Sequence, residues 1–106
     1  MPLPGLDIET TTDTDGVWIR LRGETDMSTH EQLLAGLAAA DLDGMHVVHV
    51  DLSGLAFCDV RSMCHLLVFT SGVHRNGGDV VVHGASGIVL KMINLLGVED
   101  QPKFAT

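Results

Sequence analysis

The chain has 106 residues, 45% of them hydrophobic, and its six Lys and Arg residues are outnumbered by fourteen Asp and Glu residues. This length favours one folded domain over residues 1–106 with a core of its own. The net charge of -8 argues against nucleic acid and anionic membranes as partners, because binding to phosphate groups needs clustered Lys and Arg.

The N-terminal residues lack the basic flank and apolar stretch of a signal peptide, and no apolar run approaches the roughly 20 residues of a membrane span. We therefore expect a cytoplasmic protein with no segment inserted in a membrane. The two cysteines, Cys58 and Cys64, fall within one short element, where a disulfide would be poorly placed. Reduced, buried thiols are the simpler expectation.

The first elements in the chain predict a β-hairpin. Apolar and charged residues alternate over residues 6–10, and the sequence DTDG at residues 13–16 is typical of a turn. In the strand expected at residues 17–22, the apolar residues again occupy every second position, so one side of the hairpin should be dry. Trp18 falls on the other side, where we expect it to half-cover a neighbouring group.

A helix is predicted to begin after Ser28 and to continue to about Ala40. Ser28 and Glu31 match a capping box, in which the serine accepts from the amide three residues on and the glutamate reaches back. The next strand, residues 46–52, is a nearly continuous apolar run, as expected of a strand covered on both faces. The sequence DLSG at residues 51–54 then interrupts the apolar run. Asp59, a few residues later, has the sequence context of a helix N-cap.

The helix expected at residues 60–75 carries two apolar stripes. The first is Val60, Met63, Cys64 and Leu67, and the second is Leu66, Phe69 and Val73. Two stripes indicate a helix covered on more than one side, or one that shows a face to a partner, including a second copy in a homodimer. The sequence NGG at residues 76–78 suits a left-handed C-terminal cap.

A short strand at residues 79–83 and a helix at residues 88–96, capped by Ser86, are expected to follow. The tail has room for one turn or edge strand. This order of elements predicts an α/β domain with a small mixed sheet packed by three to four helices.

Three sequence motifs, in the same order and spacing, resemble those of STAS domains, in particular the stand-alone anti-sigma factor antagonists of bacteria. They are GETD at residues 23–26, DLSGLAFCD at residues 51–59 and LLGVED at residues 95–100. The resemblance covers nearly the whole chain. It implies a STAS-like fold and a protein without catalysis or cofactor of its own, which binds an anti-sigma factor with a kinase-type ATP-binding fold and so frees a sigma factor.

The resemblance also implies a phosphorylation switch, from which this sequence departs. In the family the residue after the aspartate is the serine that accepts phosphate, whereas Val60 follows Asp59 here and has no hydroxyl. Ser62, two residues further into the helix, is a weak substitute. We therefore expect a constitutive antagonist, or one controlled by abundance or by another partner, that behaves like the dephosphorylated form which binds in the family.

The partner-binding residues are expected in two segments, one before each of the first two helices. The first segment is Asp26, Met27 and Ser28, and the second is Asp59, Val60, Arg61, Ser62 and Met63. Met27, Arg61 and Met63 are the candidate exposed anchors. Arg61 is unfavourable to the helix dipole and could pair with Asp59 or with an acidic partner.

Other function classes leave weaker signals in this sequence. The six histidines show no ligand spacing typical of structural zinc sites, so we expect no metal. A STAS-type accessory subunit that binds the ATPase of a lipid or ion transport complex is the alternative, and it would need no phosphoserine. A small enzyme or ligand carrier with a pocket near Cys58 is a third hypothesis, although this cysteine is better explained by packing.

Overall fold

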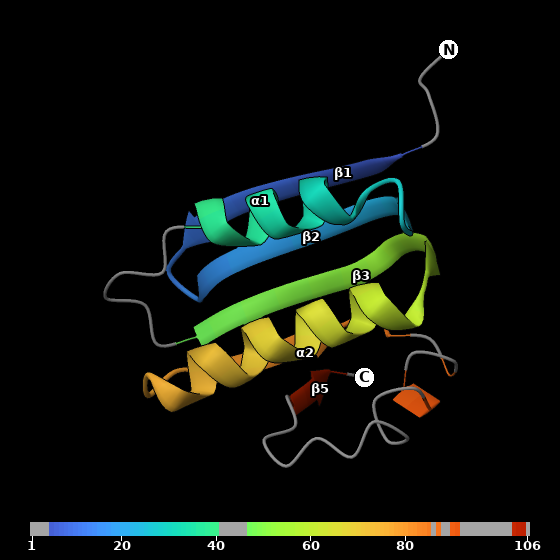
Figure 1. The fold of residues 1–106 in the computed structure, drawn as a ribbon. Coiled ribbons are helices and arrows are strands. Elements are labelled where there is room, and N and C mark those ends of the chain that lie inside the picture. Colours follow the sequence, from blue (N-terminus) through green and yellow to red (C-terminus); the bar gives the residue numbers. More distant parts are fainter. Residues whose placement is uncertain (1–4, 41–46, 86, 88–89, 92–102, 106) are drawn as a thin grey trace.

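The computed structural model describes residues 5–40, 47–85, 87, 90–91 and 103–105 of the chain. Its helices and strands (Figure 1) are β1 (Leu6–Asp13), β2 (Gly16–Thr25), α1 (His30–Ala39), β3 (Val47–Cys58), α2 (Val60–Arg75), β4 (Asp79–His83) and β5 (Lys103–Ala105). The described strands form one sheet in the order β1-β2-β3-β4-β5. Because β1 is antiparallel to β2 and the other pairs are parallel, the predicted α/β fold with a mixed sheet is confirmed.

The predicted number of helices is not matched, since the described residues contain two rather than three to four. The helix expected at residues 88–96 falls almost entirely outside the described residues. Of the turn or edge strand expected in the tail, the structure has the strand, β5, which pairs with β4. Neither described helix is long and apolar enough to cross a membrane.

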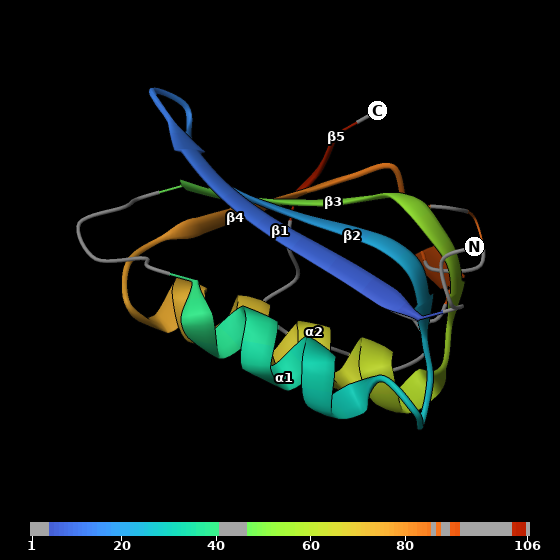
Figure 2. The ribbon, with the colours of Figure 1, turned by 90° about the horizontal axis from the view of Figure 1, so that it is seen from above.

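Both described helices lie on the same face of the sheet (Figure 2). Val48, Val50 and Leu52 in β3 are at most 5% exposed, whereas His49 and Asp51 alternate with them and are half-buried on the other face. The prediction that this strand is covered on both faces is therefore wrong. Val47 precedes this alternation and makes the run look continuous, although the strand has one polar side.

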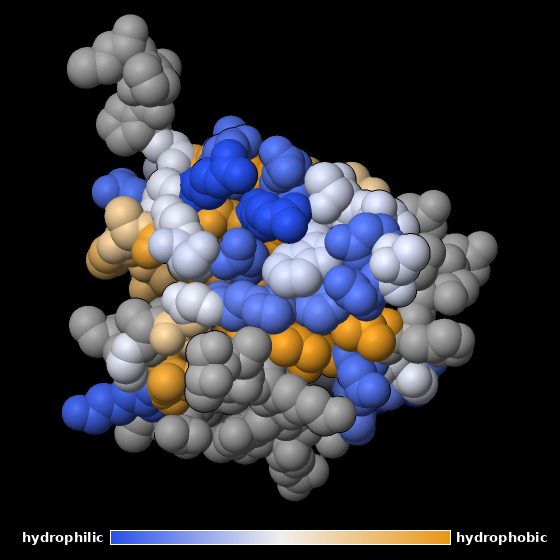
Figure 3. Space-filling model, turned by 180° about the vertical axis from the view of Figure 1, so that it is seen from behind, coloured by the Kyte–Doolittle hydropathy of each residue, from blue (hydrophilic) through white to orange (hydrophobic). Residues whose placement is uncertain are grey.

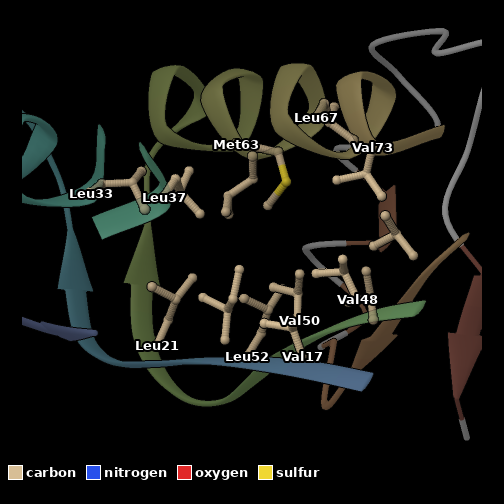
Figure 4. Packing of buried hydrophobic residues seen from close by; sticks show 14 residues of the cluster. Val17, Leu21, Leu33, Leu37, Val48, Val50, Leu52, Met63, Leu67 and Val73 are labelled. Atoms are coloured by element: carbon tan, nitrogen blue, oxygen red, sulfur yellow. The ribbon is translucent and has the colours of Figure 1, made fainter. Parts of the chain in front are cut away.

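The hydrophobic core fills the layer between the sheet and the two helices (Figure 4). Residues at every second position of β2, β3 and β4 meet the inner faces of α1 and α2, as the two periodicities require. The buried apolar residues are Val17, Ile19, Leu21, Leu33, Leu37, Val48, Val50, Leu52, Met63, Leu66, Leu67, Val73, Val80 and Val82.

β3 continues through the expected break at residues 51–54 and ends only at Cys58. The strand continues because β2 pairs with it as far as Thr25 and Cys58, with register shifts that absorb the irregular stretch. A Cβ on Gly54 would approach the Arg22 Cγ to 2.8 Å, so a larger residue at this position would displace the Arg22 side chain. The continued strand places the start of α2 directly beside the end of β2.

Two predictions based on local sequence are confirmed. The hairpin pairs β1 with β2 from Leu6 and Gly23 to Asp13 and Gly16. At the end of α2, the Gly77 amide donates to the His74 carbonyl and the Gly78 amide to the Val73 carbonyl, both at 3.0 Å. With Gly77 at φ 85°, this is the left-handed cap that the glycines predicted.

Candidate partner-binding site

The two segments predicted to bind a partner meet at one end of the sheet. Both follow the carboxyl ends of adjacent parallel strands, where Thr25 is paired with Cys58, and both lie on the right in Figure 1. The Asp59 amide donates to the Thr25 carbonyl at 3.0 Å, and the buried Thr25 hydroxyl lies 3.4 Å from the Phe57 carbonyl. Main-chain contacts therefore fix the start of α2 against the loop that leads to α1.

Asp59 is the N-cap of α2, as the sequence predicted. Its carboxylate accepts a hydrogen bond of 2.8 Å from the Ser62 amide. The pKa of Asp59 is lowered to about 2, first because the Ser62 hydroxyl lies beside the carboxylate, then because of the Ser62 amide and the His30 ring, while partial burial opposes these effects. The Ser62 hydroxyl itself has no hydrogen-bond partner of acceptable geometry within the described part of the chain.

His30 is a residue of this site that no sequence pattern indicates. It begins α1, is 9% exposed, and places Nε2 3.2 Å from the Asp59 Oδ1. The His65 ring of α2 packs edge-on against it with ring centroids 5.5 Å apart. No local sequence pattern indicates this contact, because it joins residues 29 positions apart.

The predicted capping box at the start of α1 is wrong. Thr29, rather than Ser28, occupies the N-cap position, and it makes no side-chain cap hydrogen bond. Ser28 instead donates through its amide and its hydroxyl to the Asp26 Oδ1, at 2.9 and 2.6 Å. The Thr29 hydroxyl accepts from the Asp26 amide and donates to the Glu24 carbonyl. These side chains therefore stabilise the loop instead of the helix.

The predicted partner-binding residues differ in exposure, and Asp26 and Asp59 are half-buried. Met27 is 81% exposed and Val60 57% exposed, and Arg61 is exposed as well. Ser62 and Met63 are 0% and 1% exposed, so the prediction of Met63 as an exposed anchor is wrong. Met63 is buried because it lies on the side of α2 that faces the sheet.

Phe57, which was not among the predicted binding residues, is also exposed at this end of the sheet, with an exposed fraction of 52%. It lies at the end of β3, where its backbone is in register with Glu24. We call Met27, Phe57, Val60 and Arg61 the edge patch. Three large apolar side chains are thus exposed at one end of the sheet, and exposed apolar residues gathered in one region often mark protein contact.

Arg61 forms no ion pair with Asp59 in the described part of the chain, and the Asp59 carboxylate contacts His30 instead. The second apolar stripe on α2 belongs mainly to the protein's own core, because Leu66 and Val73 are buried and Phe69 is half-buried. That stripe therefore offers little apolar surface to a second copy.

The site shows no sign of a reactive cysteine. Cys58 is half-buried, and its pKa is raised, mainly by that burial. A hollow of about 530 Å³ lies away from Cys58, between the ends of β1 and β2 and the start of α1; its lining includes Arg22, Ser28 and Gln32. In the described ranges, no group of three His, Cys, Asp or Glu residues is arranged to hold a metal ion.

The cap and its charge lead to a prediction about stability. Asp59→Ala should lower the free energy of unfolding at pH 7 by about 1 kcal/mol, whereas Asp59→Asn, which can still cap, should cost clearly less. Because the folded-state pKa is lowered, the carboxylate stabilises the fold fully above about pH 4 and loses this effect as the pH falls towards 2.

Urea unfolding of the wild type and both variants at several pH values between 7 and 2 measures these effects. The wild type should lose more stability between pH 4 and 2 than either variant does. Equal acid-induced losses in all three proteins would contradict the assigned role of the Asp59 charge.

Comparison with known proteins gives the family and agrees with the fold. A family model described as "Mlab, STAS domain" matches residues 8–104. The chain belongs to the STAS domain family. Among curated relatives of this STAS domain are an anti-sigma-B factor antagonist of Staphylococcus epidermidis, 25% identical, and one of Staphylococcus aureus, 23% identical. Each alignment covers 90% of this chain and 88% of the relative.

Solved structures show the same fold. An anti-sigma factor antagonist from Mycobacterium paratuberculosis superimposes with a TM-score of 0.77 at 18% identity, over 93% of this chain and 84% of the other. Unphosphorylated SpoIIAA, also an anti-sigma factor antagonist, gives a TM-score of 0.73 at 20% identity, and the superposition covers 94% of this chain and 88% of SpoIIAA. The Bacillus SpoIIAA in its phosphorylated form gives a TM-score of 0.69 at 22% identity, and the superposition covers 95% of this chain and 91% of the other.

Proposed function

We propose that this STAS domain is an anti-sigma factor antagonist, which acts in the cytoplasm by binding and has no catalysis of its own. Its partner is an anti-sigma factor with a kinase-type ATP-binding fold, and binding frees a sigma factor. Family membership and the names of the curated relatives support this proposal. The observation that carries it is the edge patch, where Met27, Phe57 and Val60 are exposed on a rigidly held end of the sheet.

The composition of the edge patch fits a protein partner. Its exposed apolar side chains can supply the buried centre of an interface, and Arg61 can meet an acidic group at the rim. The patch is also pre-organised, since the loop is stabilised by Asp26 and Thr29 and α2 is capped by Asp59. A patch whose backbone is held in this way loses little backbone entropy on binding.

Capture experiments with tagged bait proteins test this proposal. The wild type should recover an anti-sigma factor, and Met27→Asp, which puts a charge in the edge patch, should recover much less. Leu34→Asp is the matched control, because Leu34 is 45% exposed on α1 outside the patch. Equal recovery by Met27→Asp and the wild type would exclude the patch as the binding surface.

We further propose that the phosphorylation switch is missing. Val60 stands at the exposed start of α2 and has no hydroxyl, while the Ser62 side chain is completely buried and cannot reach the active site of a kinase without local unfolding. Val60→Ser should restore an acceptor. Incubated with ATP and the partner kinase, the wild type should keep its mass, and Val60→Ser should gain one phosphate.

Val60→Ala is the control for the change in side-chain size and should remain unmodified. Intact-mass spectrometry distinguishes these outcomes directly. A stoichiometric phosphate on the wild type would contradict the loss of the switch.

The same Val60 also favours a second candidate function, because an accessory subunit of a lipid or ion transport complex needs no phosphoserine. Such a subunit would bind a transporter ATPase. Recovery of that ATPase by the wild-type bait, with no anti-sigma factor, would support this alternative and overturn the first proposal.

A further inference from the structure

The open face of the sheet, opposite the helices, is covered by hydrophilic side chains over much of its described part (Figure 3). Three ring side chains from three adjacent strands are in contact on this face: Trp18 of β2, His49 of β3 and His83 of β4. The proposed partner site makes no use of them.

The two histidines are in direct contact. The His49 Nδ1 and the His83 Nε2 are 2.8 Å apart, a hydrogen-bond distance that requires a proton on one of the two nitrogens. The other nitrogen of His49, Nε2, lies 3.2 Å from the backbone carbonyl oxygen of Asp15, which can only accept. The neutral pair therefore has one consistent arrangement, in which His49 donates to Asp15 and His83 donates to His49.

This arrangement accommodates one additional proton but not two. With one ring charged, a single proton still lies between the two facing nitrogens, and the hydrogen bond is strengthened by the charge. With both rings charged, each of the facing nitrogens carries a proton, and two positive charges oppose each other at contact distance. The second protonation must therefore separate the rings.

We propose that His49 and His83 form a pH-sensitive latch on the open face of the sheet, closed while the pair carries at most one positive charge and opened by a second proton. Opening withdraws the rings from Trp18. The indole stacks on His49 at 4.2 Å and on His83 at 4.6 Å between ring centroids. Its buried nitrogen has no hydrogen-bond partner among the described residues, so ring contacts hold it in place.

Charged groups from each neighbouring strand act on the latch. Asp51 of β3 is in register with His83 and favours a proton there, whereas Arg20 of β2, 5.0 Å from the centre of the Trp18 ring, opposes one. Arg20 is itself 4.0 Å from both Asp51 and the Glu9 of β1, which weakens its effect.

On the far side of β4, β5 brings Lys103 into register with Val81, two positions before His83.

The pKa of His83 is lowered, first by burial and then by the charge of His49, while Asp51 acts in the opposite direction. A lowered histidine pKa means that the closed latch stabilises the fold above about pH 6.5 and loses this effect as the pH falls below that value.

The fluorescence of Trp18 reports the state of the latch, because the chain has one Trp and no Tyr. In a pH titration from 8 to 4 with EDTA present, the wild-type emission should change in two steps, one for each proton that the pair takes up. His83→Gln keeps a side-chain donor for His49 but leaves one titrating ring, so one step should remain. The control His74→Gln, on α2 across the sheet, should keep both steps.

NMR titration of the histidine ring signals in the wild type gives the same answer without a variant. The His49 and His83 signals should titrate together in two coupled steps. Independent titration of both rings near the ordinary histidine value, or Trp18 emission that does not change with them, would overturn the proposal. Failure of His83→Gln to fold would leave the NMR titration to decide.

Discussion

Met63→Ala should lower the free energy of unfolding by about 2–5 kcal/mol, the largest effect on stability that we expect from the candidate site. Met63 follows the N-cap of α2 by four residues and was expected from the sequence to be an exposed anchor, yet it is 1% exposed. Its side chain lies between α2 and the sheet (Figure 4), so truncation removes core contacts and leaves a cavity.

Urea unfolding measures this effect as a shift of the midpoint to lower urea concentration, with an unchanged slope. Val68→Ala is the matched control, because Val68 lies on the same helix and is 73% exposed. It should change stability by no more than about 0.5 kcal/mol. Similar losses in the two variants would show that Met63 does not contribute to the core as the structure indicates.

Val60→Asp should weaken binding to the anti-sigma factor by about 30-fold or more, the loss expected when a buried contact at the centre of an interface is removed. Val60 is 57% exposed at the first position of α2, within the edge patch. An aspartate there adds a negative charge to an apolar contact, and this charge must be desolvated on binding. The substitution is mild for the fold, since an acidic residue suits the first turn of a helix.

Isothermal titration calorimetry with the purified partner measures this affinity. Val68→Asp is the matched control, since it places the same charge on an exposed valine of the same helix, two turns from the patch. It should retain wild-type affinity to within a few-fold. Equal weakening by the two variants would point to net charge instead of the edge patch.

The features predicted correctly from the sequence are those set by neighbouring residues. The turn before Gly16, the cap at Asp59 and the glycine cap at Gly77 each depend on a few residues in succession, and the structure has all three. The capping box at Ser28 shows the limit of such patterns. The residue types fit a capping box, but Ser28 donates its hydrogen bonds to the nearby Asp26 carboxylate instead.

The candidate site was predicted only in part, because exposure depends on which side of a helix meets the sheet. Val60 and Met63 belong to one apolar stripe in the sequence, yet the packing of α2 exposes the first and buries the second. Phe57 becomes part of the edge patch only because β2 pairs with β3 to its end.

The sequence by itself determined the order of the described strands and helices, the hairpin and the position at which α2 begins, since these follow from hydrophobic periodicity and local capping. The tertiary structure decided which residues share a surface. The contacts of His30 with Asp59 and of His49 with His83 join residues 29 and 34 positions apart. Such pairs form only when helices and strands pack, because no local interaction brings their side chains together.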